Sequence, residues 1–347
     1  MHVKDVCAAM EVWAPKGLAY EWDPVGLRIG EPDAEVTGVL ATLSVTREGF
    51  EEARGAGANV IVSHHPFPWR PLAVFRPNDP ETRLALDIVN AGMACYAAHT
   101  NMDVVPGGVN YVLAETLGLD DPRPLLPVDH AEQVKLVTYA PEAHVAAIRQ
   151  AICEAAGGGQ AWTGTGWGEG AAPEETGERR IEVTVNKARI ADAAAALKGA
   201  HPSKEPPCEL YSRLDRDPEV GLGVRGELPA PRTLGDLARH VRAALETDHV
   251  RVAGKARAEV ARVALIGGSG GGEIPNIPAD IDVLITGDVK YHQAMAALER
   301  GLSVIDAGHH GTEKGIVTAM TRHLKQRLAG VNVCAYTEPD PFRAVTG

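Results

Sequence analysis

Residues 60–67, VIVSHHPF, join a short apolar run to two adjacent histidines, His64 and His65, and then to a proline. A β-branched run of this length, bounded by polar residues, is typical of a buried strand. Pro66 disfavours helical backbone at the residue before it, so the histidine pair stays extended. The segment therefore predicts a buried strand that presents two imidazoles at the ligand-binding edge of a sheet.

Apolar strands and amphipathic helices alternate along most of the chain. Before residue 120 we predict strands over 36–45, 59–63 and 93–100 and helices over 3–13, 46–58, 80–92 and 107–119. After a proline-containing linker at 226–233, we predict helices over 233–245, 290–301 and 312–328 and strands over 260–270, 282–288, 302–308 and 331–338. Such alternation implies α/β lobes with a largely parallel sheet.

The segment between these lobes has a different pattern. It predicts strands over 133–141, 179–187 and 208–214, helices over 142–159 and 188–202, and a turn-rich stretch at 163–178. Three strands alternating with two helices in about 80 residues fit a small ferredoxin-like domain. Because the block holds no histidine cluster, we predict an insertion, with an N-terminal lobe at 1–127, an inserted domain at 128–218 and a C-terminal lobe at 219–347.

Charge and cysteine content limit the classes of function. A formal net charge of −12 over 347 residues argues against nucleic-acid binding, because neutralising phosphates takes clustered Lys and Arg. The five cysteines form no CxxC pair, and this odd, scattered set indicates a reducing compartment. The N-terminus has no signal-peptide pattern, and no apolar run reaches the roughly 18 residues of a membrane helix. We expect a cytoplasmic protein that does not contact a membrane.

Four polar clusters follow predicted strands, where α/β sheets bind ligands. They are SHHP at 63–66, HTNMD at 99–103, TGDVKYH at 286–292 and DAGHHGTE at 306–313. A single histidine is usually a packing or surface residue, but here histidines concentrate at strand ends. The concentration predicts a shared site.

The last cluster has the spacing of a metal-binding helix. His309 and Glu313 are four residues apart, which places them on one helix face, and imidazole with carboxylate is a standard ligand set for a divalent ion. His310 should point elsewhere, and Asp306 is placed to orient a liganding imidazole. Asp103 offers a further carboxylate, suited to zinc, manganese or iron.

The adjacent histidines favour a site for two metal ions. Neighbouring residues of an extended strand point in opposite directions, so His64 and His65 rarely serve one small ion. Two ions about 3.5–4 Å apart, bridged by a carboxylate such as Glu313, use both imidazoles. The predicted ligands are His64, His65, Asp103, His309 and Glu313, and zinc, iron and manganese all suit them.

The glycine-rich segment IGGSGGG, at 266–272, follows a strand and has two interpretations. Its backbone amides can cradle a phosphate, although the Lys and Ser/Thr of a Walker loop are absent. Alternatively, it is a turn that lets the backbone approach the metal site. The sequence leaves both interpretations open.

Together, the motifs resemble the ordered signatures of the Nif-three-like family, whose members are commonly named GTP cyclohydrolase I type 2 homologues. The resemblance covers both outer lobes and rests on WDPVGLRIGEP (22–32), SHHPF (63–67), HTNMDVVPGGVN (99–110), IGGSGGG (266–272), TGDVKYH (286–292) and DAGHHGTE (306–313). The middle segment is similar to the PII-like or CutA-like insert of longer members, and its AHPSKEPPCELY (200–211) resembles their AHPYEEPAYDLY.

The resemblance implies a two-lobed Nif-three-like α/β fold with an inserted ferredoxin-like domain. It also implies a toroidal homohexamer with a dinuclear metal site that faces the central cavity. Carried over by position, His65 and Asp103 hold one metal, His64 and His309 hold the other, and Glu313 bridges them. In the segment that is usually LDVT, this chain has Ser in place of Asp at position 44. We expect such departures to affect substrate or effector contacts and not the five ligands.

Two functions follow from these expectations. The first is a metal-dependent hydrolase acting on a nucleotide or related small molecule, with His99 or His292 as acid or base. GTP is the substrate that the family name implies. The second is a non-catalytic metal-binding or regulatory protein whose inserted domain senses a small molecule.

Overall fold

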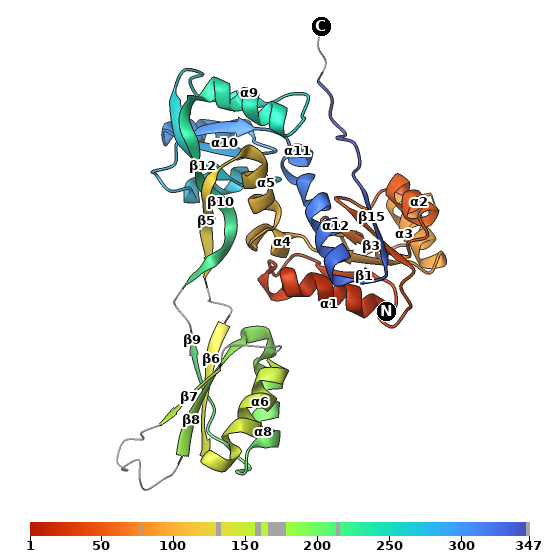
Figure 1. Ribbon diagram of the computed structural model, residues 1–347, viewed down its shortest axis with the longest axis vertical. Coiled ribbons are helices and arrows are strands. Elements are labelled where there is room, and N and C mark those ends of the chain that lie inside the picture. The colour runs from red at the N-terminus through yellow and green to blue at the C-terminus, as the bar shows by residue number, and fades with distance from the viewer. Residues whose placement is uncertain (77, 130–132, 157–160, 166–177, 213–215, 345–347) are drawn as a thin grey trace. The chain divides into compact units, whose positions relative to one another are not determined.

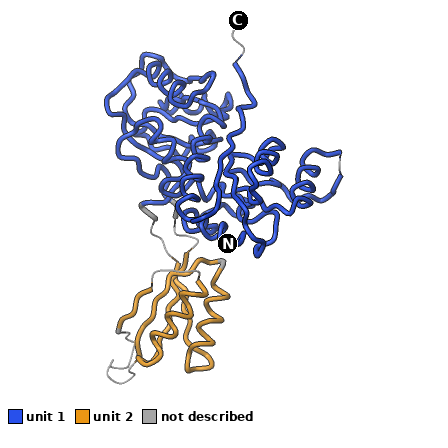
Figure 2. Tube along the Cα trace, turned by 45° about the vertical axis from the view of Figure 1, so that its right-hand side comes forward, with its two compact units in different colours: residues 1–127, 218–347 blue, residues 128–217 orange. Residues whose placement is uncertain are grey.

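The computed structural model describes residues 1–76, 78–129, 133–156, 161–165, 178–212 and 216–344. The chain divides into two compact units: Met1–Pro127 with Pro218–Gly347 forms unit 1, and Val128–Asp217 forms unit 2 (Figure 2). The predicted mixed α/β fold is confirmed, since helices accompany several sheets (Figure 1). Within the described ranges, none of the helices combines the length and apolar character needed to cross a membrane.

The first sheet of unit 1 has five strands in the order β1-β4-β3-β2-β15. They are β1 (Gly26–Ile29), β2 (Gly38–Thr42), β3 (Val60–Ser63), β4 (Ala94–Ala97) and β15 (Asn332–Tyr336). All neighbours are parallel except β1 and β4, so the carboxyl ends of β2, β3 and β4 meet at one edge. Helices α2 (Arg47–Gly55) and α3 (Pro80–Asn90) pack on side chains such as Leu40 and Ile61, while α12 (Gly315–Arg327) contacts β2, β15 and α1 (Val3–Trp13).

The second sheet of unit 1 has six strands in the order β11-β14-β13-β12-β10-β5. They are β5 (Asp120–Asp129), β10 (Arg216–Thr233), β11 (Arg251–Ala253), β12 (Glu259–Leu265), β13 (Val283–Thr286) and β14 (Ser303–Asp306). Alternate side chains of β12 and β13 enter two apolar cores. One core includes α5 (Val109–Leu117) and α9 (Leu234–Ala244), and the other includes α10 (Tyr291–Glu299) and the 3₁₀ helix η5 (Gly270–Asn276). Helix α5 also contacts α12, which packs on the first sheet, so α5 links the two sheets of unit 1.

The structure differs from the sequence expectations at one proline-containing strand and at three strands on the edges of the sheets. The linker predicted at 226–233 is instead the end of β10. Its pairing with β12 shifts register between Glu227 and Arg232, which accommodates Pro229 and Pro231 because proline has no amide to donate. The unpredicted strands β1, β5 and β11 all lie at sheet edges, where a strand is not covered on both sides and carries a weaker apolar pattern.

Unit 2 has a four-stranded antiparallel sheet in the order β7-β8-β6-β9. Its elements are β6 (Gln133–Pro141), α6 (Val145–Ala155), β7 (Ala161–Thr165), β8 (Glu178–Asn186), α8 (Ile190–Ala200) and β9 (Glu209–Ser212). Side chains of both helices, including Ile148 and Leu197, share a core with Leu136 and Ile181 of the sheet. Strand β7 was not expected, because its second half lies in the predicted turn-rich stretch; it forms by pairing with β8 at the sheet edge.

Candidate metal centre

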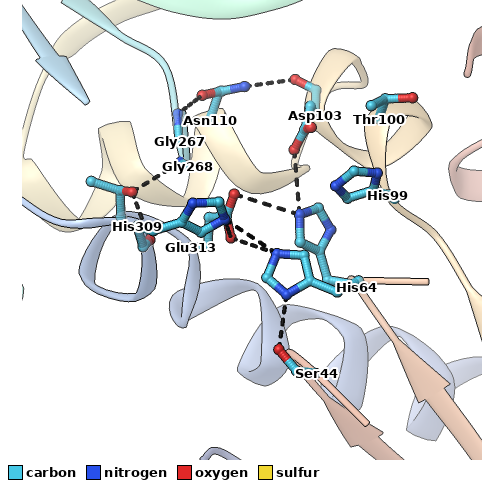
Figure 3. Close-up of polar contacts among 12 residues, drawn as sticks. Ser44, His64, His99, Thr100, Asp103, Asn110, Gly267, Gly268, His309 and Glu313 are labelled. Carbon is cyan, nitrogen blue, oxygen red and sulfur yellow. Dashed lines mark hydrogen bonds and ion pairs between the residues drawn. The ribbon is translucent and has the colours of Figure 1, made fainter. Parts of the chain in front are cut away.

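Both sheets of unit 1 deliver polar side chains to one site (Figure 3). His64 and His65 follow β3 directly. After β4, His99 precedes the short helix α4 (Thr100–Val104) and Asp103 lies within it. His309 and Glu313 are the first and last residues of α11 (His309–Glu313), which follows β14. The residues that meet are His64, His65, His99, Asp103, His309 and Glu313. The carboxyl-end rule for parallel strands therefore accounts for the position of the site.

His64 is fully buried, and its two ring nitrogens have different surroundings. Its Nδ1 donates a hydrogen bond to the carbonyl oxygen of Ala98 at 2.9 Å, which leaves the lone pair on Nε2. That Nε2 lies 3.7 Å from Oδ1 of Asp103 and 3.8 Å from Oε1 of Glu313. Burial lowers the pKa of His64 to about 4, although the nearby Glu313 acts in the opposite direction, so the imidazole is neutral.

Glu313 is buried and Asp103 is half-buried, and the two carboxyl groups have opposite pKa shifts. Burial, and after it the nearby charge of Glu313, raises the pKa of Asp103 well above its usual range. Burial also acts on Glu313, but the imidazoles of His309, His64 and His65 that surround it outweigh burial and hold the pKa of that carboxyl well below its usual range. A cation bound between the two groups would stabilise the charged form of Asp103.

His65, His309 and Glu313 form a second close group. The Nε2 atoms of the two histidines are 3.3 Å apart, and each lies 3.0 Å from Oε2 of Glu313. Burial opposes the charged form of His309, but Glu313 and Asp288 outweigh it and raise the pKa of this imidazole to about 9. The nitrogen and oxygen atoms of the three residues converge closely enough for one metal ion.

The distances group these residues differently from the division implied by the family resemblance. His64 lies with Asp103 near Oε1 of Glu313, and His65 lies with His309 near Oε2. The resemblance instead paired His65 with Asp103 and His64 with His309. Glu313 places one carboxylate oxygen near each pair.

Side chains outside the group form hydrogen bonds that orient the imidazoles of His309 and His65. The Nδ1 of His309 donates to Oδ2 of Asp288 at 2.7 Å, and the Nδ1 of His65 lies 2.8 Å from Oγ of Ser44. The expectation that Asp306 orients an imidazole is wrong, because its carboxylate accepts hydrogen bonds from the Arg251 guanidinium and from the backbone amides of residues 289 and 308. The expectation that the change at position 44 leaves the ligands untouched is also wrong, since Ser44 contacts His65 directly.

His99 stands beside the group and is held by a buried carboxylate. Its Nδ1 donates to Oδ1 of Asp23 at 3.0 Å, while Oδ2 of Asp23 accepts from the backbone amide and hydroxyl of Thr100. The His99 ring centre lies 5.1 Å from that of His64 and 5.7 Å from that of His65. The lone pair of His99 therefore resides on Nε2, within reach of the nitrogens of both neighbours.

Two other histidines of the predicted clusters lie outside this group. His292 is exposed at the second position of α10, and its ring contact is with Tyr291. The Nε2 of His310 donates to the carbonyl oxygen of Glu338 at 2.7 Å, so this side chain points away from Glu313, as its spacing predicts.

The glycine-rich segment lies directly against Glu313. A Cβ atom at Gly268, whose φ is 63°, would lie 2.1 Å from Oε1 of Glu313. The amides of Gly267 and Gly268 donate to Oδ1 of Asn110 and Oγ1 of Thr312, so these donors are not open to a phosphate. The geometry favours the interpretation in which glycine lets the backbone approach the metal site.

A cavity of about 1000 Å³ opens beside His65 and His309. Its lining includes His65, His309, Arg251, Phe342 and Arg343. The volume suits a small organic molecule. Arg251 is paired with the Asp306 carboxylate, and further carboxylates line the same cavity, so its charge is mixed.

Sequence and structure comparisons identify similar proteins. Residues 1–341 match the family model described as Duf34/NIF3 (NGG1p interacting factor 3). A protein of Halalkalibacterium halodurans named GTP cyclohydrolase 1 type 2 homolog is 32% identical over 361 residues, which covers 97% of this chain and 97% of the relative. Crystal structures of a Bacillus cereus protein related to NIF3 and of a Staphylococcus aureus protein have TM-scores of 0.77 and 0.81 and identities of 32% and 30%, and each comparison covers 99% of both chains.

Proposed function

The chain belongs to the Duf34/NIF3 family, and on this premise we propose that it binds two divalent metal ions and hydrolyses a nucleotide or related small molecule. In this proposal, His64 and Asp103 hold one ion, His65 and His309 hold the other, and Glu313 contributes one oxygen to each. Zinc, iron and manganese all suit this ligand set.

One observation carries the metal assignment. Nε2 of His64 and Oδ1 of Asp103 are buried, face one another, and have no hydrogen-bond partner among the described residues. An unsatisfied buried polar atom is costly, so two such atoms that face one another support a cation-binding site at this point. Bound divalent ions would supply Lewis acidity for polarising the bond under attack and acidifying a water molecule.

His99 is our candidate for the proton-transferring residue. Asp23 fixes its orientation, so the Nε2 lone pair stays directed to the side of His64 and His65, where it accepts a proton from the attacking water. After bond cleavage the same nitrogen returns the proton to the leaving group. His292 is exposed on α10, and we assign it no part in the reaction.

The test is metal-dependent turnover of GTP and of other nucleotides by the metal-loaded protein. We expect activity that Glu313→Gln abolishes, because the amide loses the charge on which both ligand pairs depend. Glu299→Gln is the matched control, since Glu299 is exposed at the end of α10. A fully metal-loaded protein that is inert toward all these substrates would contradict hydrolysis and leave the non-catalytic, regulatory alternative.

We further propose that unit 2 is a ferredoxin-like domain, similar to PII and CutA proteins and inserted at 128–218 between the two lobes. This rests on its order of strand, helix, strand, strand, helix and strand and on the antiparallel β7-β8-β6-β9 sheet. The resemblance to the family also supports a cytoplasmic homohexamer. Sedimentation velocity of the full chain tests the assembly, and a monomer at micromolar concentration would contradict it.

A further inference from the structure

Three large aromatic side chains are exposed together beside the candidate metal centre. Tyr20, Trp22 and Trp69 are 45%, 63% and 42% exposed. The Tyr20 and Trp22 rings are stacked, with centres 5.7 Å apart and planes inclined by 11°, and the Trp69 ring centre lies 6.2 Å from that of Trp22. We call these three residues the aromatic platform.

The aromatic platform is continuous with the candidate metal centre through His99. The Trp69 and Trp22 rings approach His99 edge-on, with centre distances of 5.2 Å and 6.4 Å. The ring of His99 also lies near the rings of His64 and His65. A molecule stacked on the platform is therefore separated from the proposed ligands by one imidazole ring.

The backbone beneath the platform is fixed to the same residues that orient His99. The amide of Tyr20 donates to Oγ1 of Thr100 at 3.1 Å, and Asp23 accepts hydrogen bonds from both His99 and Thr100. The backbone at Tyr20 is thus tied to the residues that orient His99. Aromatic side chains have few rotatable bonds, so ordering them on binding costs little entropy.

We propose that the aromatic platform binds the planar heteroaromatic ring of the substrate by stacking. This inference rests on the proposed function and adds the part of the site that recognises the substrate: exposed aromatic side chains that stack with its base. The ring would stack on Trp22, with the edge of its stack bounded by Trp69, whose plane is inclined by 52° to that of Trp22. The anionic group would then lie towards His99 and the proposed metal ligands. Aromatic stacking is tolerant of ring identity, so the platform selects a flat ring without selecting a particular base.

Calorimetric titration of the metal-loaded full chain with guanosine 5′-monophosphate tests the proposal, with ribose 5-phosphate as the probe that lacks a base. We expect Trp22→Ala to weaken binding of the nucleotide about tenfold and to leave binding of the sugar phosphate unchanged. Trp22→Phe keeps a ring and should restore most of the affinity. Trp162→Ala is the matched control, because Trp162 is 56% exposed in unit 2.

Equal nucleotide affinity in wild type and Trp22→Ala would overturn the proposal. A change in sedimentation coefficient without a change in nucleotide affinity would also overturn it, and would make the platform an interface between copies of this chain. The outcome is independent of catalysis: if the protein binds guanosine 5′-monophosphate through Trp22 but hydrolyses no nucleotide, the hydrolase assignment fails and the platform assignment stands.

Discussion

Nε2 of His64 and Oδ1 of Asp103 face each other across 3.7 Å in the interior of unit 1, and neither atom has a hydrogen-bond partner in the described part of the chain. Zinc bonds to imidazole nitrogen and carboxylate oxygen, each about 2.0–2.2 Å long, span such a gap. Glu313 approaches the same point with Oε1 and extends Oε2 towards His65 and His309. One carboxylate therefore links two sets of ligands.

Asp288→Asn should weaken metal binding without removing a ligand. Asp288 accepts the Nδ1 proton of His309, and a carboxylate in this position fixes the ring and increases the basicity of the liganding nitrogen. We expect zinc affinity to fall about 10- to 100-fold in competition with a chromogenic chelator. Asp248→Asn, at an exposed position of the same lobe, should bind zinc like the wild type. Equal affinity in both variants would exclude this role for Asp288.

Gly268→Ala should displace Glu313. The new Cβ atom would lie 2.1 Å from Oε1, and the left-handed backbone at this position costs a non-glycine residue about 1–2 kcal/mol. We expect a lower melting temperature and fewer bound ions per chain. Gly272→Ala is the control from the same loop, because its Cβ atom would meet no atom within 4 Å. Unchanged metal content in Gly268→Ala would contradict the close approach.

Metal binding should release protons at neutral pH. In the metal-free protein the pKa of His309 is about 9, so at pH 7 the imidazole is protonated and has to lose its proton before it binds a metal. Apparent affinity should therefore rise as pH increases towards 9. Calorimetric zinc titrations at pH 7, in buffers with different ionisation enthalpies, should show the release of about one proton from His309. Heats that do not depend on the buffer would contradict this prediction.

His99→Ala should separate proton transfer from metal binding. Without the imidazole held by Asp23, we expect turnover to fall at least about 100-fold while metal content stays at the wild-type level. Elemental analysis of the same preparation provides the comparison. If the variant instead loses an ion, His99 is a ligand, as its proximity to His64 and His65 also permits.

The grouping of the five proposed ligands could be predicted from the sequence because it depends on strand ends. His64 and Asp103 follow neighbouring parallel strands, and the carboxyl ends of such strands meet at one edge of a sheet. His309 and Glu313 are four residues apart, a spacing that places two side chains on the same face of a helix. Their role as ligands stays a prediction.

The residues around the ligands could not be predicted, because they depend on register and loop conformation. Ser44 reaches His65 because Thr42 pairs with Ser63, which brings positions two residues beyond each strand opposite one another. Asp288 lies in a left-handed turn, with φ of 55°, and reaches His309. Neither the strand register nor that turn has a signature in this sequence.

Metal content of the purified full chain tests the central claim most directly. After loading with zinc and removal of free metal, we predict about two ions per chain for the wild type and fewer for both His64→Ala and Glu313→Ala. His292→Ala, which changes an exposed histidine outside the group, should keep about two. Fewer than one ion per wild-type chain, or equal content in all four proteins, would contradict a dinuclear centre at Glu313.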